Sequence, residues 1–332
     1  MEFGERPTDQ AEGAILAHSV RLPAGRIRKG KVLTAEDISL IRAAGLTTVT
    51  VARLSPTDVH EDQAALTLAR AVVPNPEAAG LILRPVGTGR VNIISSGPGL
   101  AEIRAGRIHA LNATDPMITV ATVPPWQRMA GGGMVATIKI IAYGVPGAAL
   151  DRACAAGRNA LLLRAPCLRS LALICTVTGA PESEKGRLAV AARVRRLGAD
   201  LRQLPDVRHD AATLATALLT AADQGAEAIL ILTGSATSDA QDTAPSALRL
   251  AGGTLHHFGM PVDPGNLLFI GDLRGRPVIG LPGCARSPAL NGADWVLERV
   301  ICGVPVTGRD ISAMGVGGLL KEIPERPRPR DA

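Results

Sequence analysis

The sequence predicts an α/β protein of 332 residues built from three parts. Three observations support this prediction. Residues 168–303 alternate apolar strand segments with helical segments, a spacing typical of a mostly parallel sheet with helices on both faces. Residues 86–145 are short strands and turns without a sustained helical period, and residues 1–62 mix strand and helix patterns. We therefore expect a small α/β segment, a β-rich module and a C-terminal three-layer α/β/α domain.

Changes in composition place the boundaries between these parts. The break between Pro74 and Pro85 separates the first part from the second. We expect an N-terminal α/β segment over 1–73, a β-rich module over 74–148, the α/β/α domain over 149–310 and a Pro/Arg-rich tail over 311–332. The closing residues EIPERPRPRDA are expected to form an extended linker or a disordered end.

Composition narrows the classes of function. Aromatic residues make up 2% of the chain and the net charge of +6 comes from scattered arginines, so we expect no nucleic-acid partner. No apolar run is long enough for a transmembrane helix, and we expect a soluble cytoplasmic protein without a membrane partner. The five cysteines show no CxxC or Cys/His spacing, which favours reduced thiols over disulfides or a zinc site.

The first helix is predicted from its end signals. Thr34 is a candidate N-cap with Asp37 three residues on, and TAEDISLIRAAG ends at Gly45. TVTVARL then alternates as a strand. The polar cluster Asp58, His60, Glu61 and Asp62 opens the helix EDQAALTLARAVV. We interpret this cluster as a solvated helix N-terminus, and a metal site is the alternative.

The middle of the chain is predicted as strands and turns. IRAGRIHALN, residues 103–112, is included among the expected strands. The glycines at 131–133 lie between strands without a βαβ frame, so we interpret them as a turn rather than a nucleotide-binding loop. Residues 150–157 are expected to form the helix that leads into the last domain.

The first loop of functional interest follows the wholly apolar strand AILIL, residues 228–232. It runs from Thr233 to Pro245, and Gly234 permits a tight exit from the strand. Asp242 falls just before Pro245, a favoured first residue of a helix. The Asp242 carboxylate has two interpretations that spacing does not separate: it caps the helix, or it binds Mg²⁺ that bridges phosphates.

A second loop, GLPGCARSP, ends the strand RPVIGL. Pro282 and Gly283 shape a turn whose backbone N–H groups are expected to form an anion nest, and Arg286 is expected to bind a phosphate through two donors. Cys284 has no adjacent base, so we do not expect it to act as a nucleophile. Neighbouring parallel strand ends form the crevice in which α/β proteins bind ligands, so the two loops predict a site for a phosphate-bearing small molecule.

Two histidine segments are interpreted as structural. His256 and His257 are adjacent on an expected strand and point to opposite faces, so they do not chelate one ion easily. That strand leads toward Asp263 at the rim of the expected site. His209 precedes Asp210, an expected helix cap. A His209 side chain facing the ligand is the less favoured alternative.

These loops resemble those of a known family. TGSATSDAQDTAP resembles the TGG…RDxTP loop of molybdopterin adenylyltransferases and the related loop of molybdopterin molybdotransferases, including gephyrin-like proteins. HFGMPVDPGN and GLPGCARSP are similar to the molybdotransferase segment that ends in GLPGNPxS, and residues 11–55 are similar to its N-terminal stretch. The resemblance covers residues 11–55 and 165–305 and is closest to a bacterial group often fused to a nucleotidyltransferase. The matching loop residues are Thr233, Gly234, Asp242, Pro245, Pro264, Gly265, Gly280, Pro282, Gly283 and Ser287.

The two loops depart from the family pattern at four positions. Ser235 replaces the second glycine of the first loop, Ala244 stands where threonine is preferred, and GCA replaces GNP in the second loop. Residues 75–145 do not match the core enzymes of the family, and the sequence assigns them no role.

The resemblance implies a molybdopterin-binding domain that acts in molybdenum cofactor biosynthesis. A transferase of this kind uses Mg²⁺ and ATP to adenylylate the pterin phosphate, or inserts molybdate into adenylylated molybdopterin. Asp242 and Asp239 are then the expected catalytic residues, and Asp242 is the expected Mg²⁺ ligand. The residues implied to bind molybdopterin are Thr233, Gly234, Ser235, Pro264, Gly265, Pro282, Gly283, Cys284, Arg286 and Ser287.

Two other functions are weighed against a transferase. One is a non-catalytic carrier that presents the cofactor to a nucleotidyltransferase or an apo-molybdoenzyme. The other is an unrelated nucleotide-binding enzyme, which is disfavoured because no GxGxxG or GxxxxGK[ST] follows a strand. The resemblance also implies a homo-oligomer.

Overall fold

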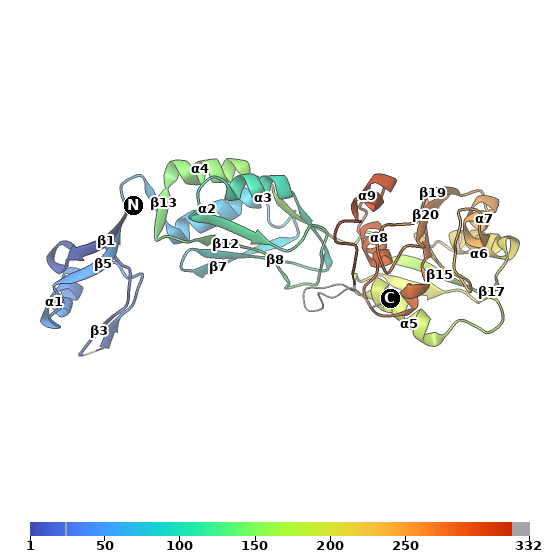
Figure 1. Cartoon of the computed structure of the whole chain (residues 1–332), viewed down its shortest axis with the longest axis horizontal. Coiled ribbons are helices and arrows are strands. Elements are labelled where there is room, and N and C mark those ends of the chain that lie inside the picture. Colours follow the sequence, from blue (N-terminus) through green and yellow to red (C-terminus); the bar gives the residue numbers. More distant parts are fainter. Residues whose placement is uncertain (24, 321–332) are drawn as a thin grey trace. The chain divides into compact units, whose positions relative to one another are not determined.

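The structure is a computed structural model that describes residues 1–23 and 25–320. The chain divides into two compact units (Figure 1). Unit 1 comprises residues 1–97 and 101–163, and unit 2 comprises residues 98–100 and the chain from 164 onward. The predicted C-terminal domain starts at residue 149, so unit 2 begins later along the chain. Each unit is described by itself below.

The first part of unit 1 is a three-stranded antiparallel sheet in the order β1-β5-β2, with one helix and a separate β3–β4 hairpin. Thr34 and Asp37 form the predicted capping box at the start of the helix. Gly45 follows the helix with a φ of +80°, as expected for a glycine that ends it. The elements are β1 (Glu2–Pro7), η1 (Thr8–Gln10), β2 (Ile15–Leu16), β3 (Val20–Leu22), β4 (Gly25–Ile27), α1 (Ala35–Ala43) and β5 (Thr48–Arg53).

The rest of unit 1 is built on an antiparallel sheet in the order β10-β12-β8-β7, with α2, α3 and α4 over one face (Figure 1). Smaller sheets have the orders β11-β9-β14 and β13-β6. The elements are β6 (Asp58–His60), α2 (Glu61–Val72), β7 (Leu81–Gly87), β8 (Arg90–Ser95), β9 (Gly99–Ile103), α3 (Ala105–Asn112), β10 (Ile118–Thr122), β11 (Arg128–Met129), β12 (Met134–Ile140), β13 (Gly144–Pro146), α4 (Gly147–Ala156) and β14 (Leu161–Arg164).

The prediction of a strand over 103–112 was wrong for most of that segment. Residues 105–112 form α3, and only the end of β9 falls within it. Ile108 and Leu111 are buried three residues apart, which is the spacing of one helix face. The segment is too short for this spacing to stand out, and it contains β-branched and glycine residues that also suit strands and turns. The β-rich module therefore contains a helix.

Unit 2 contains one large sheet in the order β16-β15-β18-β21-β20-β19, with β17 also paired to β15. β16, β17, β15, β18 and β21 are parallel, and β20 and β19 form an antiparallel extension. The elements are β15 (Ser170–Val177), α5 (Glu184–Arg195), β16 (Asp200–Gln203), β17 (Val207–Arg208), α6 (Ala211–Asp223), β18 (Ala228–Leu232), α7 (Thr243–Leu250), β19 (Thr254–Phe258), β20 (Phe269–Leu273), β21 (Arg276–Leu281), η2 (Gly283–Arg286), α8 (Gly292–Ile301) and α9 (Gly308–Ala313).

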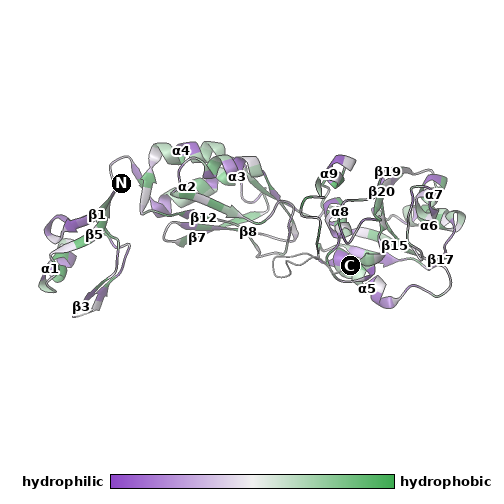
Figure 2. Ribbon diagram, viewed as in Figure 1, coloured by the Kyte–Doolittle hydropathy of each residue, from purple (hydrophilic) through white to green (hydrophobic). Residues whose placement is uncertain are grey.

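Helices cover the large sheet in two groups. α6 packs with α7, and α5 packs with α8, which gives the predicted three layers. The central strand β18 is buried at every residue, as its apolar sequence AILIL requires. Figure 2 shows hydrophilic residues on α5 and α9, in keeping with helices that keep one side in water. The predicted fold class is confirmed.

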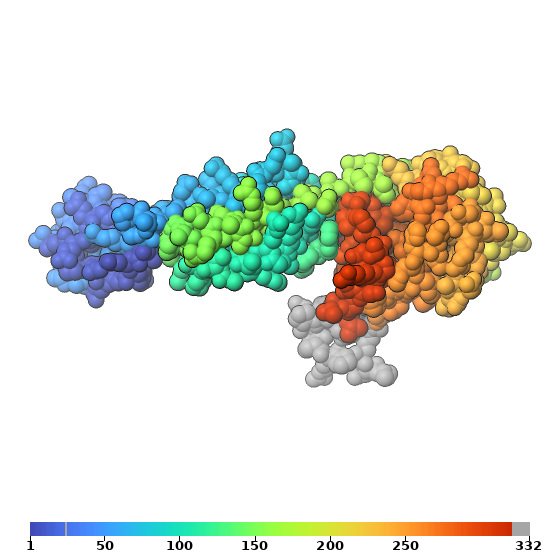
Figure 3. Space-filling model, turned by 90° about the horizontal axis from the view of Figure 1, so that it is seen from above, coloured from blue at the N-terminus to red at the C-terminus, as the bar shows by residue number. Residues whose placement is uncertain are grey.

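The last described residues return to the loop between β19 and β20. Asp263 N–H donates to the Gly318 carbonyl at 2.9 Å, and Leu320 N–H donates to the Asp263 carbonyl at 3.0 Å. In the space-filling view this segment, coloured red, lies on the surface beside the orange part of unit 2 (Figure 3). The predicted tail over 311–332 therefore begins inside α9, and its residues 321–332 lie outside the described part.

Candidate functional site

The two predicted loops lie side by side at one edge of the large sheet. β18 and β21 are parallel neighbours, so the loops that follow them leave the same edge. β15 is the other neighbour of β18. After β15 the chain first forms β16 and β17 on the side of β15 away from β18, and only then forms β18. The gap between β15 and β18 is thus a topological switch point, where open α/β sheets bind ligands. We call the side chains gathered here the carboxyl-edge cluster: Thr176, Glu182, His209, Thr233, Gly234, Asp242 and Arg286.

Gly234 holds the first loop close to β15. A Cβ at this position would lie 2.7 Å from the Thr176 carbonyl oxygen and 3.1 Å from the Val177 Cα. The Gly234 N–H donates to Thr176 Oγ1 at 2.9 Å, and the Thr233 hydroxyl donates to the Ser235 carbonyl at 2.6 Å. Glycine is therefore required here by backbone packing, which leaves the following exposed residues as the part of the loop open to a ligand.

Asp242 caps α7, which confirms the capping interpretation. Its Oδ2 accepts from Ser238 N–H at 2.9 Å and its Oδ1 accepts from Thr243 N–H at 2.6 Å. The Ser238 hydrogen bond is the main cause that lowers the Asp242 pKa, against a smaller opposing effect of burial. The helix begins at Thr243, so Pro245 is its third residue and not its first, a position where a helix still needs no N–H donor. The carboxylate stays ionised at neutral pH, and its role as a Mg²⁺ ligand stays a prediction.

Asp239 lies in the exposed part of the same loop. Its Oδ1 accepts from Gln241 N–H at 2.7 Å, and its carbonyl oxygen accepts from Asp242 N–H at 3.1 Å. These contacts close a local turn and bring Asp239 and Asp242 into one short segment. Across residues 1–23 and 25–320, no group of three or more His, Cys, Asp or Glu side chains is arranged to hold a metal ion.

The second loop forms a short 3-10 helix, η2, where we expected an anion nest. Two of its N–H groups are used within the loop, because Ala285 donates to the Pro282 carbonyl and Ser287 to that of Cys284. Gly283 is exposed, and a Cβ there would meet only Arg286 Nη1, at 3.7 Å. Packing does not require glycine at this position, so the missing side chain leaves open space beside the guanidinium.

Arg286 connects its own loop after β21 with the loop after β15, which carries Glu182, and with the loop after β18. Its Nε donates to both carboxylate oxygens of Glu182 at 3.0 and 3.1 Å, and its Nη2 donates to Glu182 Oε2 at 2.6 Å and the Thr233 carbonyl at 2.8 Å. Burial would raise the Glu182 pKa, but the hydrogen bonds and charge of Arg286 outweigh it and lower the pKa. Nε and Nη2, the two donors that would bind a phosphate together, are therefore already occupied by Glu182 and the Thr233 carbonyl. Nη1 is the nitrogen without a partner among the described residues.

A buried arginine on α5 donates hydrogen bonds to the backbone of the second loop and the residues after it. Arg193 Nε donates to Asp294 Oδ1 at 2.7 Å. Its Nη1 donates to the Ala285 carbonyl at 2.8 Å, and its Nη2 donates to the Ser287 and Ala289 carbonyls at 2.6 and 2.9 Å. Both charged side chains are about 5% exposed. Sequence reasoning missed Arg193, whose only local signal is a charged residue on the buried face of an otherwise apolar helix segment.

The remaining predicted binding residues are distributed around the second loop. Gly265 packs against the start of α8, where a Cβ would lie 2.7 Å from Gly292 N, and the Pro264 carbonyl accepts from Gly292 N–H at 2.8 Å. Ser287 is exposed, and its Oγ accepts from Ala289 N–H at 3.3 Å. Cys284 is half-buried within η2. The structure thus gives Pro264 and Gly265 a packing role at the same sheet edge.

Thr176 and His209 complete the cluster from the β15 side. Thr176 Oγ1 lies 2.8 Å from His209 Nδ1, and Thr176 is completely buried. Asp210 caps α6 as predicted, with its Oδ1 accepting from Thr213 N–H at 2.9 Å. The charge of His209 is also among the causes that lower the Asp242 pKa. Sequence reasoning missed Thr176 and Glu182, because their partners lie tens of residues away.

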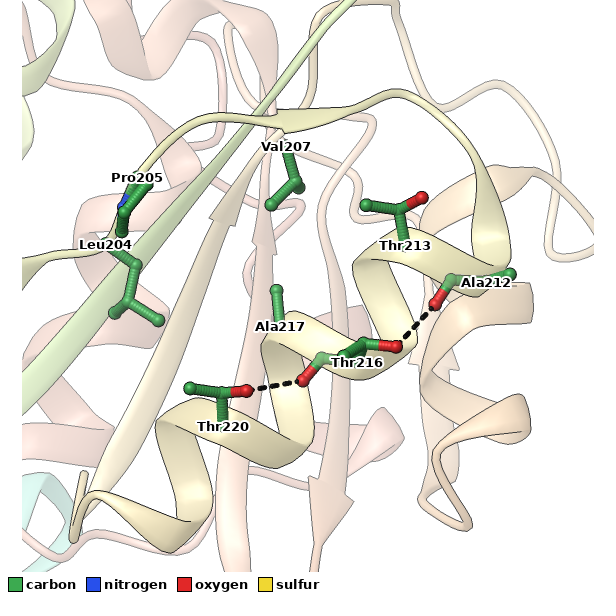
Figure 4. Close-up of a pocket in the computed structure, with 8 residues that line it drawn as sticks. All are labelled: Leu204, Pro205, Val207, Ala212, Thr213, Thr216, Ala217 and Thr220. Atoms are coloured by element: carbon green, nitrogen blue, oxygen red, sulfur yellow. Dashed lines mark hydrogen bonds between the residues drawn. The ribbon is translucent and has the colours of Figure 1, made fainter.

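A separate groove of about 490 Å³ lies between α6 and the β16–β17 segment (Figure 4). Its lining has no charged side chain, and Thr216 and Thr220 donate their hydroxyl protons back to α6 carbonyls. A phosphate would find no positive partner there, so this groove does not suit the predicted ligand. The lining residues are Leu204, Pro205, Val207, Ala212, Thr213, Thr216, Ala217 and Thr220.

The predicted alternative sites elsewhere have structural explanations. His60 caps α2, with its Nδ1 accepting from Asp62 N–H at 3.3 Å, and Asp62 Oδ1 accepts from Gly89 N–H at 2.7 Å. His256 and His257 lie on β19, as predicted. Within the described residues, no helix is long and apolar enough to cross a membrane.

Comparison with known proteins gives a family match near the N-terminus and distant structural similarities, including the following two. Residues 5–53 match a domain of unknown function, DUF8806. No curated protein matches the chain. A molybdopterin biosynthesis moea protein from Pyrococcus horikosii is 15% identical, with 93% of this chain and 76% of that chain covered and a TM-score of 0.33. A molybdenum cofactor biosynthesis protein from Pyrococcus furiosus is 13% identical, with 92% and 66% covered and a TM-score of 0.26. The chain is thus distantly similar to proteins of this kind, at TM-scores too low to carry an argument about function.

Proposed function

We propose that this protein binds molybdopterin at the carboxyl-edge cluster, with the pterin phosphate beside Gly283 and Arg286. The observation that supports the proposal is the position of the two loops. Segments 233–245 and 280–287 carry the family-like sequence patterns, and they meet at the carboxyl ends of β18 and β21, next to the switch point between β15 and β18. Two loops separated by dozens of residues would not converge there by local sequence pattern alone.

The residues present suit an anionic ligand in two respects. Gly283 leaves open space next to Arg286 Nη1, and that nitrogen has no partner among the described residues. Arg286 is held in place by Glu182 and by the Thr233 carbonyl, so its position is set before a ligand arrives. In adenylylated molybdopterin, or when ATP reacts with molybdopterin, the nucleotide adjoins this phosphate and would lie toward the exposed first loop.

Two versions of the function differ in chemistry. In the transferase version, a pterin phosphate oxygen attacks the α-phosphorus of ATP and pyrophosphate leaves. Alternatively, the two dithiolene sulfurs of adenylylated molybdopterin bind molybdate as an oxide leaves as water, and hydrolysis of the phosphoanhydride bond releases AMP. Mg²⁺ would supply positive charge to the phosphates, and Asp242 with Asp239 would hold it. In the carrier version, the protein delivers bound cofactor to a nucleotidyltransferase or a molybdoenzyme. The Glu182 charge favours the carrier, because it neutralises the arginine that would otherwise stabilise phosphate charge.

Binding is tested by anaerobic purification, followed by mass spectrometry of the released ligand and titration with molybdopterin. Gly283→Val fills the space beside Arg286 and should abolish binding while unfolding like the wild type. Gly106→Ala is the control, because Gly106 also faces open space but lies on α3 in unit 1. If Gly283→Val binds molybdopterin as tightly as the wild type, the phosphate does not bind beside Gly283.

Asp242→Asn separates the two versions. The amide oxygen accepts one of the two hydrogen bonds that the carboxylate accepts from Ser238 N–H and Thr243 N–H, but the charge that would hold Mg²⁺ is gone. In the transferase version pterin binding survives and turnover falls by orders of magnitude, since a metal contributes several kcal/mol of charge stabilisation. In the carrier version the variant matches the wild type in binding and in cofactor transfer. A homo-oligomer is part of the same proposal, and sedimentation analysis measures it directly.

A further inference from the structure

His209 is the one residue of the carboxyl-edge cluster that sequence patterns treated as structural. It follows β17 directly and is half-buried. Its backbone N–H donates to the Val177 carbonyl at 3.0 Å, so the residue is fixed to the end of β15. The ring then lies against the completely buried Thr176 hydroxyl, with Nδ1 2.8 Å from Oγ1.

The hydrogen bonds of Thr176 determine which ring nitrogen carries the proton. A threonine hydroxyl has one proton to donate and two lone pairs that accept. Thr176 Oγ1 accepts from the Gly234 N–H, and His209 Nδ1 is the acceptor for its proton within the described residues. If Nδ1 carried a proton instead, the buried hydroxyl proton would have no acceptor, which is unfavourable for a buried donor. The neutral ring is therefore protonated at Nε2.

Nε2 has no hydrogen-bond partner among residues 1–23 and 25–320. His209 and Arg286 act on the same dipeptide, Thr233-Gly234, from opposite sides, because β15 and β21 flank β18. His209 acts through Thr176 on Gly234 from the β15 side, and Arg286 binds the Thr233 carbonyl from the β21 side. Two residues that each carry an N–H donor without a partner in the described part of the chain thus act on the base of the first loop, His209 through Thr176 and Arg286 directly.

We infer that His209 Nε2–H is a ligand-binding donor, which hydrogen-bonds a phosphate oxygen of the bound molybdopterin. The inference rests on the proposed function for the identity of the ligand. Thr176 is the positioning residue, since it touches no ligand and sets the proton and orientation of the ring.

Two substitutions divide the roles of the ring nitrogens. In His209→Asn the amide reaches the position of Nδ1 and retains a partner for Thr176, but it leaves no donor at Nε2. In His209→Gln the longer amide places a donor near Nε2 and loses the contact with Thr176. We expect His209→Asn to weaken molybdopterin binding about tenfold or more, as for hydrogen bonds to a charged acceptor, with little change in unfolding. His209→Gln should retain most of the affinity and unfold more easily.

A measurement without ligand tests the first half of the inference. Ring ¹⁵N chemical shifts distinguish a protonated from an unprotonated nitrogen, and the His209 signals are assigned by their loss in His209→Asn. We expect protonation at Nε2 in the neutral ring of the wild type and a mixture of both forms in Thr176→Val. Protonation at Nδ1 in the wild type would overturn the inference.

The binding titrations distinguish this inference from the proposed function. Equal affinity of the wild type and His209→Asn for molybdopterin would overturn the role of His209 and leave the proposed function intact. A wild type that does not bind molybdopterin would overturn the proposed function, and the phosphate contact with it, whatever the ring shifts show.

Discussion

Replacing Arg193 with methionine should destabilise unit 2 strongly and loosen the second loop. The guanidinium donates to Asp294 and to the carbonyls of Ala285, Ser287 and Ala289, all at 2.6–2.9 Å. Methionine matches much of the apolar length of the side chain but none of its donors. The substitution therefore leaves a buried carboxylate without its partner and three carbonyls without a donor.

The expected loss of unfolding free energy follows from the burial of the Arg193–Asp294 ion pair. The Arg193 and Asp294 side chains are 4% and 5% exposed, so water does not replace the lost contacts. Breaking a buried ion pair by removing one partner costs about 3–5 kcal/mol. With a urea dependence of about 2 kcal/mol per molar, the unfolding midpoint of unit 2 should fall by roughly 2 M.

The assay uses the two tryptophans of the chain, one in each unit. In a Trp126→Phe background, the fluorescence of Trp295 reports urea unfolding of unit 2 alone. Arg193→Met with Asp294→Asn should recover part of the loss, because no buried charge is left unpaired. Arg195→Met is the control, since Arg195 is exposed on the same helix and should change stability by no more than about 0.5 kcal/mol.

Two results would refute this reasoning. A midpoint for Arg193→Met within experimental error of the control would show that the ion pair and the carbonyl contacts contribute nothing net. An additive double variant, with no recovery from Asp294→Asn, would show that the cost does not come from the unpaired carboxylate.

Three further predictions concern other groups. Burial raises the pKa of Glu61, so folding favours its protonated form, and the stability of unit 1 falls as pH rises through that pKa. Glu61→Gln should therefore stabilise unit 1 at pH 7 and have no effect near pH 4, measured by Trp126 fluorescence; an equal effect at both pH values would contradict the pKa shift. Gly234→Ala should cost about 1–3 kcal/mol and alter the first loop, since its Cβ would lie 2.7 Å from a backbone oxygen; unchanged urea unfolding of unit 2 would rule out this contact. The lowered pKa of Glu182 means that its contribution is present at neutral pH and lost as pH falls through that pKa, so Glu182→Gln should destabilise unit 2 at pH 7 and less at low pH. The same variant removes the negative charge beside Arg286 and keeps one oxygen that accepts from it, so phosphate affinity in calorimetric titration should rise; a fall would show that a neutral acceptor does not hold the arginine in place.

The sequence by itself determined the features that depend on neighbouring residues. Thr34 and Asp210 were predicted as helix caps, and a cap was one of the two interpretations of Asp242. Each of the three makes its capping contacts within four residues of itself. Hydrogen bonds of this range are encoded in residue type and spacing, so they can be predicted without knowledge of the fold. The alternation of strands and helices over residues 168–303 is a pattern of the same kind, and it predicted the parallel sheet correctly.

Only the tertiary structure decided which distant side chains meet. Glu182 and Arg286 are 104 residues apart, Arg193 and Asp294 are 101 apart, and Thr176 and His209 are 33 apart. Each pair depends on which strands are neighbours in the sheet, and the sequence predicted strands but not their order. The same limit explains the prediction for Arg286. Its residue type and its position in a turn suggested an arginine that is free to bind the phosphate of a ligand. Its partner Glu182 comes from the loop after β15, and strand order alone brings that loop beside η2.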